Sequence, residues 1–182
     1  MLGALRNRAA LRRKAGDIYG AIVTQARQLE FYAKLGIPDT PIGRYDMIVL
    51  HLFLALERLH REGLAADTLQ RVVLEAFVAD MDDSLRELGT GDVVVGKKVR
   101  RAAAGFYERS RNYRAALAEG DCALEQALVQ HGLARPDQPQ EGRALAAYVR
   151  AAKTALEGQS GQELLAGRLT FPHLAEPPED HR

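Results

Sequence analysis

The sequence predicts an all-α protein: a single compact helical domain of about six to seven helices without a significant β-sheet. Two observations support this prediction. Apolar residues recur at helical spacing through most of the chain, and residues that favour helices, above all Ala, Leu, Arg and Glu, are abundant. Only Val93–Val95 resembles a strand, and three residues make no sheet.

The first two expected helices are separated by a loop. The first begins at Asp17, which is suited to be its N-cap, and its apolar stripe consists of Ile18, Ile22, Ala26, Leu29 and Ala33. The loop covers 35–43, because two prolines and two glycines break any helix there. The second helix covers 44–61 and is apolar nearly all round from Tyr45 to Leu56, which is typical of a buried helix.

Four more helices are expected after this buried one. The third covers 67–88, with Gly89 as its stop signal. The fourth covers 96–119 and the fifth covers 121–132. A connector rich in Pro and Gln then leads to the sixth helix over 141–157.

A chain of 182 residues fits one domain with a modest appendage. We expect a basic N-terminal segment over 1–16, a helical domain over 17–170 and a frayed C-terminal tail over 171–182. The single cysteine, Cys122, fits a reducing compartment. The longest apolar run, Met47 to Leu56, is shorter than the about 20 residues that span a bilayer. These features predict a cytoplasmic protein.

Two motifs resemble phosphate-binding sites, and both are incomplete. Residues 91–98 almost match a phosphate-binding loop, but Lys98 stands where a hydroxyl should hold Mg²⁺, and a helix precedes the motif. Asp80-Met81-Asp82-Asp83 resembles a diphosphate-binding cluster, but the sequence lacks the second aspartate cluster that prenyl transfer would need. We interpret the first motif as a turn between helices and the second as surface acids, with a charged contact site as the alternative.

Three further sets of residues are of the types that carry chemistry. Glu57-Arg58-Leu59-His60 is half of a di-iron motif without its second half, so we interpret it as the solvated last turn of a helix. His51 lies within the apolar helix, which favours a hydrogen-bonded core histidine. Cys122 has no histidine partner nearby in sequence, which favours a structural thiol. The sequence therefore predicts no catalytic residues, no metal ligands and no cofactor.

Charge is strongly segregated along the chain, although the formal net charge is only +1. Residues 67–92 carry seven acids against two arginines, whereas 97–118 carry seven cations against one acid, Glu108. Four cations, Lys97, Lys98, Arg100 and Arg101, crowd the first turn of the fourth expected helix, where the helix dipole disfavours them. This placement indicates an anionic partner. The alternative is a solvated basic face beside the acidic helix.

Three segments resemble the ubiquinol–cytochrome c chaperone family in order and spacing, over roughly residues 17–150. The first contains Phe31-Tyr32, Gly36-Ile37-Pro38-Asp39-Thr40 and Gly43-Arg44-Tyr45-Asp46-Met47, and continues into Leu50-His51. The second is Phe77 to Gly89, with Asp80-Met81-Asp82 and Leu85-Arg86-Glu87-Leu88. The third runs from Gly91-Asp92 through Val95-Gly96-Lys97-Lys98-Val99 to Phe106-Tyr107. Glu108 departs from the pattern, which has a small residue there.

The resemblance implies a non-enzymatic assembly chaperone that binds newly made cytochrome b during biogenesis of ubiquinol–cytochrome c reductase, the bc1 complex. It further implies work near the ribosome exit, with a second assembly factor as a candidate partner. The basic N-terminal segment is suited to peripheral contact with anionic lipid at the inner face of the inner membrane, and no specific DNA binding is expected. The expected client-binding residues are Asp39, Arg44, Asp46, Asp80, Asp82, Arg86, Asp92, Lys97, Lys98 and Arg101.

Two alternatives of other classes stay open at the level of sequence. The first is a protein that binds nucleic acid or the ribosome surface through the basic turn Lys97–Arg101, with a steep dependence on salt. The second is an enzyme that acts on a diphosphate, which would need a cavity shielded from water and facing Asp80 and Asp83.

Overall fold

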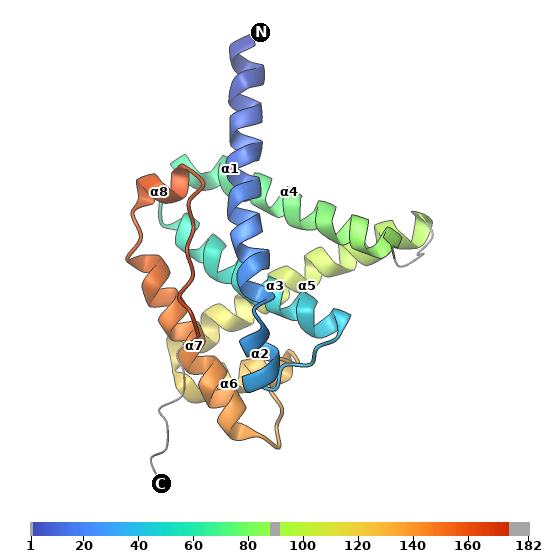
Figure 1. Cartoon of the computed structure of the whole chain (residues 1–182), viewed down its shortest axis with the longest axis vertical. Helices are drawn as coiled ribbons and strands as arrows, with labels where there is room; N and C mark the ends of the chain where they lie inside the picture. The colour runs from blue at the N-terminus through green and yellow to red at the C-terminus, as the bar shows by residue number, and fades with distance from the viewer. Residues whose placement is uncertain (1, 88–91, 175–182) are drawn as a thin grey trace.

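The computed structural model describes residues 2–87 and 92–174, and it contains eight helices within them (Figure 1). In chain order these are α1 (Leu2–Ala26), α2 (Leu29–Lys34), α3 (Pro41–His60), α4 (Leu64–Glu87), α5 (Asp92–Glu119), α6 (Asp121–Gln130), α7 (Pro139–Glu157) and α8 (Gly161–Leu165). The described ranges contain no strand, so the all-α prediction is confirmed. The expectation was about six to seven helices, and the short helices α2 and α8 account for the difference.

α3 is the central helix of the fold and packs against α1, α4, α5 and α7 (Figure 1). Every residue from Met47 to Ala55 is at most 4% exposed, which confirms the expected buried helix. α3 begins at Pro41 and not at the expected Arg44. Proline suits the first position of a helix, and the Thr40 hydroxyl accepts a hydrogen bond of 3.1 Å from the Gly43 amide.

α1 is longer than expected, and the predicted N-cap at Asp17 is wrong. The helix runs without a break from Leu2, because the segment before Asp17 consists mostly of Ala, Leu and Arg, which are strong helix formers. Its N-terminal part extends away from the body of the molecule (Figure 1). At its other end α1 stops at Ala26, and the extended backbone of Gln28 separates it from α2.

α4 and α5 pack against each other and extend together to one side of the molecule (Figure 1). The residues that resembled a strand, Val93–Val95, belong to the first turn of α5. An isolated β-branched triplet has no partner strand to pair with, so the helix continues through it. Gly89 and Gly91, which are the expected stop signal and the start of the motif that resembles a phosphate-binding loop, lie outside the described residues.

The chain after α8 runs back along the body and is packed against it. Gly167 permits this turn: its φ is +91°, and a Cβ there would lie 2.9 Å from the Lys14 Cα on α1. Leu169 and Phe171 are buried. The expected boundary of a frayed tail at 171 therefore lies too early, because burial of apolar side chains orders this segment.

None of the helices in the described ranges combines the length and the apolar character that are needed to cross a bilayer.

Candidate functional site

An open groove of about 670 Å³ lies where the start of α3 meets the end of α1, the second half of α4 and the middle of α5. Several of its apolar side chains are accessible: Ile42 is 73% exposed, and Tyr45 and Met81 are half-buried. The groove therefore offers apolar surface to a partner. The lining residues are Arg27, Asp39, Thr40, Pro41, Ile42, Arg44, Tyr45, Ile48, Asp80, Met81, Ser84 and Ala102.

The local sequence folds the preceding loop tightly against the first turn of α3. Gly43 is buried there, and a Cβ at this position would collide with the carbonyl oxygen of Pro38. Only glycine permits this close approach of two backbone segments. Together with the Thr40 cap, it fixes the loop that carries Asp39, and the first turn of α3 that carries Ile42, at the edge of the groove.

The charges that line the groove are of both signs. Arg44 Nε donates to Asp39 Oδ1 over 2.7 Å, and this pair is exposed. Arg44 lowers the pKa of the Asp39 carboxyl through this hydrogen bond. Asp80 accepts a hydrogen bond of 2.8 Å from the Tyr19 hydroxyl of α1. With Arg27, the lining thus has two cations and two acids, so their formal charges cancel.

Polar contacts connect α3 and α5 beside the groove. They involve Tyr45, Asp46, Ala102 and Arg109. The Tyr45 hydroxyl donates to the Ala102 carbonyl over 3.2 Å, and the Tyr45 ring lies under the Arg109 guanidinium at 5.8 Å. Arg109 Nη2 lies 3.0 Å from Asp46 Oδ1, a distance that makes an ion pair, although the geometry gives no hydrogen bond. Burial raises the pKa of Asp46 to about 6 in spite of Arg109.

The structure brings three of the expected client-binding residues together at the groove, namely Asp39, Arg44 and Asp80. Asp46 differs from the expectation: it is 3% exposed, because it lies on the buried helix and pairs with Arg109. Its carboxylate is thus engaged with α5 and is not part of the groove lining.

The other expected residues belong to α4 and α5. Asp82 and Arg86 form an exposed ion pair of 2.6 Å on α4, at the i, i+4 spacing that favours such pairs. Lys97 and Arg101 are exposed on α5. The side chains of Asp92 and Lys98 lie outside the described ones.

The sequence indicated a binding surface that includes the Pro38–Asp46 segment, but it singled out only charged residues there and not the apolar residues that line the groove. We interpreted Pro41 as a helix breaker, which placed Ile42 in a loop, whereas it lies in the first turn of α3. A signal was present: Ile42, Tyr45 and Ile48 recur at helical spacing, which is typical of one helix face.

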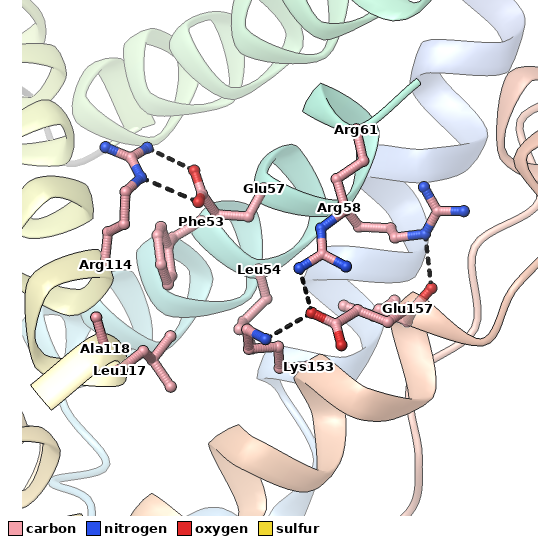
Figure 2. A pocket seen from close by; sticks show the side chains of 11 residues that line it. Phe53, Leu54, Glu57, Arg58, Arg61, Arg114, Leu117, Ala118, Lys153 and Glu157 are labelled. Carbon is pink, nitrogen blue, oxygen red and sulfur yellow. Dashed lines mark hydrogen bonds and ion pairs between the residues drawn. The ribbon is translucent and has the colours of Figure 1, made fainter. Parts of the chain in front are cut away.

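A second hollow, of about 310 Å³, lies between α5 and α7 at the end of α3 (Figure 2). Ion pairs span its rim: Arg114 binds Glu57 (2.5 Å), and Lys153 (2.5 Å) and Arg61 (2.6 Å) share Glu157. Most of its apolar lining is covered, because Phe53, Leu54 and Leu156 are at most 2% exposed, while Leu117 is half-buried and the small Ala118 is exposed. The hollow thus has little apolar area to bury, and the groove is the better candidate site.

The remaining motifs have structural explanations. His51 is fully buried and hydrogen-bonded through both ring nitrogens, to the Met47 carbonyl and to the Tyr148 hydroxyl, each at 2.8 Å, which confirms the core histidine. Glu57 pairs with Arg114, and His60 is exposed at the end of α3. Cys122 is free and exposed. Within the described ranges no group of three or more His, Cys, Asp or Glu side chains is arranged to hold a metal ion.

The alternative of an enzyme acting on a diphosphate receives no support from the geometry. Asp80 lines the groove, but Asp83 is exposed and does not line it, and the groove is open to solvent. All of the motif that resembles a phosphate-binding loop except its first residue is helical, because α5 begins at Asp92.

Comparisons with known proteins agree on one family. The model of the family described as ubiquinol-cytochrome C chaperone matches residues 33–171. Ubiquinol-cytochrome-c reductase complex assembly factor 1 of Xenopus laevis is 26% identical over 161 residues, which cover 87% of this chain and 80% of the frog protein. The protein of the same name from Mus musculus is 24% identical over 87% of this chain, and that from Homo sapiens is 25% identical. The chain spans about half the length of these two, 55% and 54%.

A solved structure is similar over nearly the whole chain. The crystal structure of the Cbp3 homolog from Brucella abortus has a TM-score of 0.83 and is 38% identical in sequence. The similarity covers 96% of this chain and 98% of the Brucella chain.

Proposed function

Because the chain belongs to the ubiquinol–cytochrome c chaperone family, we propose that it is a chaperone for assembly of ubiquinol–cytochrome c reductase and that it binds newly made cytochrome b. We also propose that the protein works without catalysis: it holds its client and then releases it. The observation that carries the client site is the groove at the start of α3, where accessible apolar side chains lie beside Asp39, Arg44 and Asp80.

The proposed client surface consists of the groove and the charged faces next to it. Asp82 and Arg86 continue the surface along α4, and Lys97 and Arg101 continue it along α5. Exposed charges steer a partner and select its orientation, while apolar contacts supply most of the affinity. The resemblance adds Asp92 and Lys98 to this surface, although their side chains are not described.

The N-terminal part of α1 is the proposed contact with an anionic membrane surface. It extends away from the body and exposes Arg6, Arg8, Arg12 and Arg13, with no acid before Asp17 (Figure 1). Each cation near an anionic bilayer contributes about 1 kcal/mol. This contact would hold the protein at the cytoplasmic face of the membrane that receives cytochrome b. A second assembly factor and the ribosome remain proposed partners on the strength of the family alone.

Affinity capture from cells that make their own respiratory chain tests the proposal. The tagged full chain is expected to enrich cytochrome b over an untagged control. The variant in which Lys97, Lys98 and Arg101 are replaced by Glu should lose this enrichment and keep its helical circular dichroism. A matched variant carries Glu at Arg71, Arg143 and Arg168, which are exposed and do not line the groove. Absence of every reductase subunit from the wild-type capture would refute the proposal.

A further inference from the structure

We propose that the groove at the start of α3 receives the uncharged apolar face of a client helix, about two turns long. This inference rests on the proposed function and specifies the chemistry that the client presents. It concerns the apolar residues that line the groove, whereas all of the expected client-binding residues are charged.

The first argument is the exposure of apolar side chains around the groove. Ile42 is 73% exposed at the edge, although isoleucine is among the residue types most often buried. Pro41 is exposed beside it, and Met81 of α4 and Ala102 of α5 are half-buried in the other walls. Apolar residues from three helices thus converge on one concavity, which is the arrangement of a helix-binding groove.

The second argument is the balance of charge. Arg44 and Asp39 neutralise each other across 2.7 Å, and the lining contains one further cation, Arg27, and one further acid, Asp80. A charged side chain that entered the groove would lose hydration without a net opposite charge to replace it. The groove therefore favours an uncharged face over an acidic or a basic one. The same balance disfavours the phosphate headgroup of a lipid.

The third argument is that the groove is preformed and of suitable size. Tyr45 fixes its walls, because its hydroxyl binds the Ala102 carbonyl and its ring stacks on Phe77 of α4 at 6.2 Å. The volume of about 670 Å³ lies within the range of specific binding sites. Helices bind such grooves through apolar residues at i, i+3 or i+4, and i+7, a row that spans about two turns.

Titration with designed peptides tests this inference on the full chain. The probe is a fluorescently labelled helix of about 12 residues with capped ends, four Leu along one face and Gln elsewhere. Two matched probes carry Lys or Glu in place of one central Leu.

The groove variant is Ile42→Asp. The control variant is Leu64→Asp, because Leu64 is 90% exposed at the first residue of α4 and does not line the groove. Both positions are exposed, so both variants should fold, and circular dichroism checks this.

The uncharged probe should bind the wild-type chain about tenfold more tightly than either charged probe, with an affinity that hardly changes with salt. Ile42→Asp should weaken it about tenfold, and Leu64→Asp should change it less than about twofold. Equal binding of the charged probes, or equal weakening by Leu64→Asp, would overturn the inference. Binding of anionic phospholipid vesicles that requires Ile42, without binding of the uncharged peptide, would also overturn it and identify a lipid site.

Capture from cells separates a failure here from a failure of the proposed function. If wild type and Ile42→Asp enrich cytochrome b equally, the groove inference is wrong and the chaperone proposal stands. If wild type enriches no reductase subunit, the proposed function fails and this inference fails with it.

Discussion

Removal of the hydroxyl group of Tyr148 should destabilise the fold strongly, although it removes only one atom from the core. Tyr148 of α7 connects two other helices: its hydroxyl lies 2.8 Å from His51 Nε2 on α3 and accepts a hydrogen bond of 3.0 Å from Gln25 Nε2 on α1. His51 Nδ1 must donate to the Met47 carbonyl, so Nε2 is the acceptor for the Tyr148 hydroxyl. The Tyr148 hydroxyl therefore donates one hydrogen bond and accepts one, and each ring nitrogen of His51 makes one.

The expected loss follows from what Tyr148→Phe leaves unpaired. His51 Nε2 is fully buried and would lose its only donor, which costs about 1–3 kcal/mol. Gln25 would keep its hydrogen bond of 3.0 Å to the Pro172 carbonyl, so its loss is smaller. The ring itself and its edge contact with Phe31 at 4.8 Å are retained. We expect a total loss of about 2–3 kcal/mol in the free energy of unfolding.

Urea denaturation at pH 7, followed by circular dichroism, measures this loss. The matched control is Tyr107→Phe, because Tyr107 is 63% exposed. The control should change the free energy of unfolding by less than about 0.5 kcal/mol. If Tyr148→Phe were no more destabilising than Tyr107→Phe, the argument that His51 Nε2 is left buried and unpaired would be wrong.

Three other perturbations test the supports of the groove and the role of α1. Burial raises the pKa of Asp46 to about 6, so the folded state gains a proton there as the pH falls from 7 to 5. The free energy of unfolding should therefore rise over this range by about 1 kcal/mol relative to Asp46→Asn. Parallel pH profiles of the two proteins would contradict this shift. Gly43→Ala should lower the stability and weaken client capture, because its Cβ collides with the Pro38 carbonyl, and unchanged denaturation would show that the loop yields without cost. Deletion of residues 2–9 should shift the melting temperature by less than about 2 °C and reduce binding to anionic vesicles at low salt. Deletion of residues 2–14 should also destabilise the fold, because Leu11 packs on the core and Lys14 lies against Gly167. Equal melting temperatures of the two truncated proteins would contradict this boundary.

The sequence predicted the centre of the fold better than its edges. The apolar run around His51 indicated a buried helix and a core histidine, because a helix that is apolar all round can be stable only inside a protein. The same run contained the signal that Asp46 is buried, but its partner Arg109 is distant in sequence, and pairing over that separation is not readable from periodicity.

The apolar half of the candidate site was missed for a related reason. Pro41 both breaks and begins helices, and only the tertiary position of the loop decides between the two roles. Ile42 was therefore assigned to a loop, while its charged neighbours Asp39 and Arg44 were recognised through the resemblance to the family. The comparisons confirm that resemblance, with a family match over residues 33–171.

The central claim concerns assembly of ubiquinol–cytochrome c reductase, and the amount of assembled complex in cells that lack this chain tests it most directly. Membranes are solubilised mildly, and the complex is quantified on native gels together with its b-type haem spectrum. The account predicts that the complex and its b-type haem are lost without the chain and return when the wild-type chain is supplied. A normal amount of assembled complex in cells without the chain would contradict it.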